Sequence, residues 1–228
     1  MKQTVDIIGD LVAGLSQTTA ITSITELDGV STINTSATHW INKGSKVTID
    51  GAIYDVLSVV YNQSFTIMAT GLVASEYTLA APDYMHGTRN AVSGERDGML
   101  TQLHKDKCPF VWLVEPYRER DYKDPLSNIA RDSSLVLVFL DASDVSEWTT
   151  NKHYEEVITP MDNLKDTFFT SVYKSNLFLD LEYIDTIRQV MFGVESPKGH
   201  DKGILNENLT GIECRFDLSI RKQSNCNI

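Results

Sequence analysis

A strict alternation of apolar and polar residues over positions 211–221 constrains the fold of this chain more than any other feature. The apolar set occupies every second position: Ile212, Cys214, Phe216, Leu218 and Ile220. The intervening set is charged or polar: Glu213, Arg215, Asp217, Ser219 and Arg221. Because successive side chains of a strand point to opposite faces, the segment predicts a strand with one dry face and one solvated face. Such a strand is typical of an antiparallel sheet that is covered on one side.

Two continuous apolar runs, at residues 110–114 and 134–140, predict central strands of the same sheet. Residues 152–174 carry apolar side chains at helical spacing, which predicts a helix that covers the dry face. Pro160 either kinks this helix or begins a second one after Thr159. Segregated strands and helices favour an α+β fold built on a mainly antiparallel sheet covered by helices.

Residues 18–82 form a segment of different composition, rich in Thr, Ser, Val and Ile and poor in charge. Asp28-Gly29 and Asp50-Gly51 are hairpin turn signals between β-rich runs. The strands expected in this segment lie at residues 19–27, 30–36, 45–49, 52–61, 64–70 and 76–80. Short strands at this spacing predict a small all-β barrel or sandwich.

The segment 18–82 is therefore expected to be an inserted β-rich domain. Residues 1–17 predict an amphipathic helix that belongs to the main domain, and residues 83–228 form the rest of that α+β domain. Within it, the polar stretch 82–103 is expected to be a loop, and residues 179–194 contain one more strand.

The charge and cysteine content exclude several classes of protein. A formal net charge of −11 argues against tight nucleic-acid binding, because an acidic surface repels phosphate backbones. The three cysteines Cys108, Cys214 and Cys226 form no CxxC pair and are expected to be reduced thiols. No apolar run approaches the roughly 18–20 residues of a membrane span, so no membrane partner is predicted.

Motifs that would identify an enzyme or a cofactor are absent from the sequence. It contains no P-loop and no GxGxxG, GxSxG, HExxH or CxxC pattern, so we predict no enzyme, no catalytic residue, no cofactor and no metal. The nearest approach to a metal motif is Asp141-Ala142-Ser143, which begins a DxSxS pattern that Val145 breaks. A strand end followed by a helix cap explains these residues better.

Two alternatives to that prediction stay open. One is a monomeric β-rich ligand- or metal-binding module that uses the inserted domain or Asp141 and Ser143. The other is an enzyme whose site assembles from residues far apart in the sequence, which motif searches do not detect.

Residues 115–132 are dense in charge and predict a long hairpin loop between two strands. The loop either is solvated or reaches onto a neighbouring subunit. Under the second interpretation, six charged residues are candidate subunit-interface residues: Arg118, Glu119, Arg120, Asp121, Lys123 and Asp124.

Four stretches of the chain resemble neck and tail-terminator proteins of tailed bacteriophages. Residues 107–113, with the sequence KCPFVWL, are similar to a "YPFIWL" strand of such proteins, apart from Cys108 in place of an aromatic residue. Residues 84–88 resemble their "hGT" loop, residues 154–169 their long helix, and residues 209–221 their closing strand. The segment 18–80 is larger than the equivalent part of a minimal tail terminator.

The resemblance implies a tail-terminator-like α+β domain that assembles side by side into a ring of six or twelve subunits. It implies a structural virion protein at the head–tail interface, which joins the portal or head to the tail and lines or seals the DNA conduit. The implied partners are other copies of the chain, other neck, portal or tail-tube proteins, and DNA that passes through the lumen without specific binding. The implied location is the virion, after assembly in the host cytoplasm.

Overall fold

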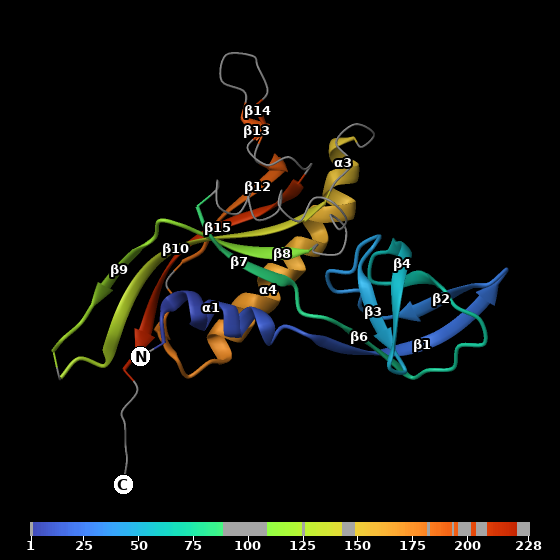
Figure 1. The fold of residues 1–228 in the computed structure, drawn as a ribbon, viewed down its shortest axis with the longest axis horizontal. Coiled ribbons are helices and arrows are strands. Elements are labelled where there is room, and N and C mark those ends of the chain that lie inside the picture. The colour runs from blue at the N-terminus through green and yellow to red at the C-terminus, as the bar shows by residue number, and fades with distance from the viewer. Residues whose placement is uncertain are drawn as a thin grey trace, which may run out of the picture.

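The structure is a computed structural model that describes residues 2–88, 109–124, 126–142, 149–181, 183–192, 194–195, 202–203 and 209–222. Its fold is α+β and rich in strands, with a closed barrel beside a larger sheet (Figure 1). The chain enters the barrel from helix α1 (Thr4–Ala13) and leaves it into strand β7 (Asp83–Gly87). The predicted α+β class is confirmed, and helices cover the sheet only in part.

The barrel consists of six antiparallel strands in the closed order β1-β2-β5-β4-β3-β6. The strands are β1 (Gln17–Leu27), β2 (Val30–Thr35), β3 (Lys46–Ile49), β4 (Ala52–Val60), β5 (Ser64–Met68) and β6 (Glu76–Leu79). All four residues of the turns at Asp28-Gly29 and Asp50-Gly51 have positive φ, as tight two-residue hairpins require. Pairing of β1 with β6 closes the sheet, so the inserted strands form a barrel rather than a sandwich.

The interior of the barrel is filled by side chains. The rings of Phe65 and Tyr77 meet edge to face with centroids 5.0 Å apart. Around them lie buried aliphatic residues from four strands: Ile33, Val47, Ile49, Val56 and Ile67. This packing is the core of a small structural barrel.

The larger sheet has seven strands in the order β11-β15-β10-β8-β7, with β12 also paired to β15 and β9 also paired to β10. The remaining strands are β8 (Phe110–Val114), β9 (Arg118–Asp121), β10 (Ile129–Ala142), β11 (Phe178–Asp180), β12 (Asp185–Phe192) and β15 (Leu209–Arg221). A separate two-stranded pair is formed by β13 (Val194–Glu195) and β14 (Lys202–Gly203). Every pairing in the large sheet is antiparallel except β7 with β8.

Strand β7 corrects part of the expected loop at residues 82–103. Asp83–Gly87 pair in parallel with β8, and the Tyr84 hydroxyl donates a 3.0 Å hydrogen bond to the carbonyl of Val5 in α1. Packing of Tyr84 beneath the first helix therefore adds a strand that the polar sequence did not indicate. Residues 89–103 of the expected loop lie outside the described residues.

The two faces of the sheet differ along its length. The five apolar positions of β15 are buried as predicted, and four of the five alternating polar positions are at least partly exposed. Glu213 is the exception at 5% exposure, and it accepts hydrogen bonds from Arg215 and Gln189. At the β8 end a second apolar cluster is buried on the opposite face: Phe110, Trp112, Val138, Leu140 and Leu209. The expectation of a single dry face thus holds only at the β9 end.

A continuous helical segment covers the main apolar face. It comprises α3 (Thr150–His153), a π-helical turn η1 (Tyr154–Ile158) and α4 (Thr159–Lys174). Pro160, which has no backbone N–H to donate, lies in the first turn of α4. The wide π turn before it lets the helix continue, with the Thr159 N–H bonded to the Tyr154 carbonyl. Among the described residues, no helix has the length and apolar character needed to cross a membrane.

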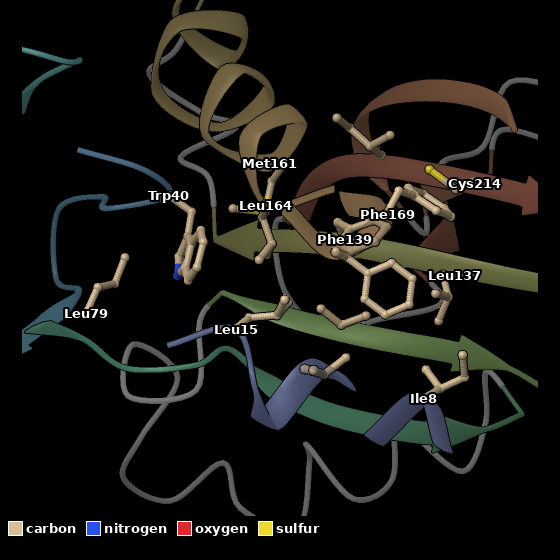
Figure 2. Packing of buried hydrophobic residues seen from close by; sticks show 14 of the residues in the cluster. Ile8, Leu15, Trp40, Leu79, Leu137, Phe139, Met161, Leu164, Phe169 and Cys214 are labelled. Carbon is tan, nitrogen blue, oxygen red and sulfur yellow. The ribbon is translucent and has the colours of Figure 1, made fainter. Parts of the chain in front are cut away.

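An aromatic cluster joins α4 to the sheet. Phe169 of α4 lies edge to face with Phe216 of β15, with ring centroids 5.1 Å apart. Phe168 contacts Phe139 of β10 in the same manner at 5.9 Å. Figure 2 shows Phe169 next to Phe139, with Cys214 beside them. These contacts fix α4 across β10 and β15.

The barrel and the sheet share one hydrophobic core. Trp40, in the connection between β2 and β3, is fully buried, and Figure 2 shows it between Leu79 of the barrel and Leu164 of α4. Polar contacts reinforce this junction: Asn163 of α4 donates to the carbonyl of His39 at 3.3 Å. The barrel is therefore packed against the main domain rather than held only by its two connections.

Burial predicts an unreactive thiol at Cys214. Its place on the dry face of β15 raises the pKa of this thiol to about 12. Because the thiolate is the reactive form, we expect iodoacetamide near pH 8 to modify Cys214 at least about a hundredfold more slowly in the folded protein than in guanidinium chloride. Mass spectrometry of the peptide that contains Cys214 measures this ratio. Equal rates in the two conditions would contradict the packing of β15.

Candidate subunit interface

The charged segment predicted as a long loop is largely a β-hairpin. Arg118–Asp121 form β9, which pairs antiparallel with residues 131–134 of β10. The expectation of a loop over residues 115–132 is wrong for this part, because Glu119 and Asp121 bind Arg131 on one face of a strand. Four of the six candidate interface residues are therefore fixed in the sheet.

One face of β9 is bound to the rest of the domain through Arg131. The Arg131 guanidinium donates to Asp121 Oδ1 at 2.7 Å and to Glu119 Oε1 at 3.2 Å, and its side chain is only 14% exposed. The hydrogen bond to Asp121 is the main cause that raises the pKa of Arg131 above its ordinary value. Thr4, at the start of α1, donates to Glu119 and lies 3.3 Å from the Ser133 hydroxyl. Glu119 and Asp121 thus hold β9 against α1 and β10.

The other face of β9 presents two arginines over a polar hollow. Arg118 and Arg120 lie opposite Ser134 and Asp132, are exposed, and have no ion pair or hydrogen bond within the described residues. The hollow has a volume of about 310 Å³. Its lining comes from three neighbouring strands: Arg118, Arg120, Asp132, Ser133, Ser134, Asp217, Leu218 and Ser219.

The carboxylates of this hollow, unlike the arginines, have partners in the same chain. Asp132 accepts hydrogen bonds from the Tyr122 hydroxyl at 2.7 Å and from the Ser219 hydroxyl at 2.6 Å. Asp217 accepts one from Tyr183 at 3.2 Å. Among the described residues that line the hollow, the two guanidinium groups are therefore the charges that remain available to a ligand or another protein.

Strand β9 is also an edge strand. Within the described residues it pairs with β10 alone, so its outer side carries backbone donors and acceptors without partners, and all four of its residues are exposed. Such an edge can accept a strand from another chain, and charged side chains limit unspecific pairing. The combination provides main-chain bonding together with charge selectivity.

The last two candidate residues lie in the turn of the hairpin. Asp124 Oδ1 accepts a 2.9 Å hydrogen bond from the Leu126 N–H, and its carbonyl accepts from Ser127 and from the Lys222 ammonium. Asp124 therefore shapes the turn. Lys123 is exposed beside it. Leu126, which the sequence analysis did not select, is 89% exposed at the same turn.

The other candidate site was Asp141 with Ser143, and the structure describes only Asp141. The carboxylate of Asp141 is bound by groups of the same chain. Asp141 is buried near the end of β10 and accepts hydrogen bonds from Asn42 Nδ2 at 2.9 Å and from the Ala142 N–H at 2.7 Å. Ser143 lies outside the described residues. Across the described part of the chain, no group of three or more His, Cys, Asp or Glu side chains could hold a metal ion. Asp141 thus links the β2–β3 connection of the barrel, through Asn42, to the end of β10.

Comparison with known proteins leaves the geometry as the main guide. No protein-family model and no curated protein matches this chain.

The two residues that position β9, Arg131 and Thr4, were missed by sequence reasoning. The alternation of Arg118, Glu119, Arg120 and Asp121 was the available signal, because in a strand it places the two signs of charge on opposite faces.

Proposed function

We propose that this protein is a structural virion protein of a tailed bacteriophage that forms a ring at the head–tail interface, as a neck or tail-terminator protein. The observation that carries the proposal is the edge at β9, where the outer backbone groups and two arginines have no partner within the described residues. A ring needs such an edge for lateral contact between subunits. The tail-terminator-like resemblance of residues 84–226 supports the same assignment.

The rest of the chain is consistent with a passive conduit. The net charge of −11 would let DNA pass through a ring without binding to its wall. In this proposal the subunit is not an enzyme and needs no cofactor. It contacts other copies of itself in a ring of six or twelve, and portal, neck or tail-tube proteins above and below, within a virion assembled in the host cytoplasm.

The described residues favour a ring over a monomeric β-rich ligand- or metal-binding module. Such a module would use the barrel interior or Asp141. The interior is filled by side chains such as Phe65 and Tyr77, and Asp141 is bonded to Asn42. Within the described residues, the β9 edge in contrast carries backbone groups and two guanidinium groups without internal partners.

Native mass spectrometry of the purified protein at several concentrations tests the proposal. We expect a closed oligomer of six or twelve, alone or after addition of a portal or tail-tube protein. The double variant Arg118→Glu with Arg120→Glu should reduce this oligomer at least tenfold, because it reverses the free charges of the edge. The matched control Lys43→Glu with Lys46→Glu makes the same change in net charge on the barrel and should assemble normally. A monomer under all of these conditions would refute the ring.

A further inference from the structure

We propose that the ring contact is head to tail, with β9 of one copy paired to the opposite sheet edge, at β11 and β12, of the next copy. This inference rests on the proposed ring and names the partner of the β9 edge. Its basis is that β9 and β11, on opposite edges of the seven-stranded sheet, run in opposite directions, lie at the same level and differ in charge.

Strand directions allow the two edges to pair. Strand β9 runs antiparallel to β10, β10 runs antiparallel to β15, and β15 runs antiparallel to both β11 and β12. Strands β11 and β12 therefore run opposite to β9. When copies stand side by side in the same orientation, β9 meets β11 of its neighbour as an antiparallel pair. The contact would continue the antiparallel order of the sheet from one subunit to the next.

Strands β9 and β11 also lie at the same level of the sheet, whereas β12 begins further along β15, where Asp185 pairs with Arg215. Arg120 pairs with Asp132, Asp132 with Ser219, and Ser219 with Asp180 of β11. One row of backbone partners thus runs from β9 to β11 across four strands. A sideways repeat with no shift along the strands places the two edges next to each other. Contacts between unlike surfaces close into a ring when they repeat without such a shift and the rotation per subunit divides a full turn, and otherwise they form an open filament.

Charge selects this partner. Arg118 and Arg120, on the face of β9 over the hollow, have no ion pair or hydrogen bond within the described residues. On the opposite edge, Asp180 belongs to the same row of backbone partners as Arg120, and Asp185 at the start of β12 is exposed. It also exposes part of an aromatic ring at Tyr183, which is 51% exposed. Carboxylates on an edge strand would provide charge-assisted bonds to the two guanidinium groups. Two β9 edges facing each other would instead bring four arginines together.

A charge-swap experiment tests the pairing. One variant combines Arg118→Glu and Arg120→Glu, and the other combines Asp180→Arg and Asp185→Arg. Each variant alone sets like charges against each other at every contact, so the concentration needed for half-assembly should rise at least tenfold. An equal mixture restores opposite charges at every contact. We therefore expect rings of alternating composition in native mass spectrometry, and the variant that carries all four substitutions should assemble by itself.

The possible outcomes separate this inference from the proposed function. Rings of the unmodified protein with no effect of the acidic-edge substitutions would overturn the head-to-tail contact and leave the ring intact. Failure of the mixture to assemble, with both variants folded by circular dichroism and thermal unfolding, would overturn it equally. Absence of any ring from the unmodified protein, even with its neck partners, would instead refute the proposed function.

Discussion

Replacement of Gly211 by alanine is expected to lower the free energy of unfolding by about 3 kcal/mol or more. A Cβ at this position of β15 would meet the carbonyl oxygen of Phe139 at 2.0 Å and the Cα of Leu140 at 3.0 Å. Both atoms belong to the backbone of β10, so no rotamer change relieves the clash. The two strands would have to separate at the centre of the sheet, which breaks ladder hydrogen bonds worth about 0.5–1.5 kcal/mol each.

Urea unfolding followed by circular dichroism measures this loss. The control is Gly14→Ala at the C-terminal end of α1, where the nearest atom lies 3.4 Å from the added Cβ and φ is −79°. The control should change stability by less than about 1 kcal/mol, in the stabilising direction. Similar unfolding midpoints for Gly211→Ala and the unmodified protein would mean that β15 does not lie against β10 as described.

Truncation of Trp40 to alanine is expected to cost about 3–5 kcal/mol. The indole is fully buried between the barrel and α4, so its removal leaves a cavity where the two parts of the molecule share their core. The lost stability should weaken the contact between the barrel and the sheet more than it weakens either of them alone. We therefore expect unfolding to become less cooperative, with separate transitions for the barrel and the sheet.

The variant Trp40→Phe provides the matched control. The indole Nε1 has no hydrogen-bond partner among the described residues, so phenylalanine removes an unsatisfied donor while it keeps an aromatic ring. This variant should lose less than about half as much stability as Trp40→Ala and keep a single transition. The comparison uses differential scanning calorimetry. A single, unshifted transition for Trp40→Ala would contradict the shared core.

The sequence predicted best where local signals define an element. The barrel strands follow from their turns, since Asp28-Gly29 and Asp50-Gly51 require positive φ and so mark hairpins. The alternation along β15 likewise defined its buried face. Strand β7 was missed because its polar residues are held by packing against α1, a contact between distant parts of the chain. Burial of the second face at Trp112 was not expected for the same reason.

The sequence selected the candidate residues as a group, but it did not predict which of them bind to other residues of the same chain. Charge density selected residues 118–124, and nothing in that density tells an internal ion pair from a free charge. Pairing with β10 determines which charges are bound, because it places Glu119 and Asp121 beside Arg131. Long-range register of this kind depends on which strands meet, which local patterns do not encode.

The way the chain enters and leaves the barrel bears on how such a protein could evolve. Gln17 and Leu79, at the two ends of the barrel segment, are paired directly in neighbouring strands. A single in-frame insertion between α1 and β7 would therefore add or remove the whole barrel without changing the order of the sheet. Without the barrel, Met161 and Leu164 of α4 would lose the contacts that bury them on the barrel side (Figure 2). A relative that lacks the barrel is therefore expected to carry polar residues on that side of the helix.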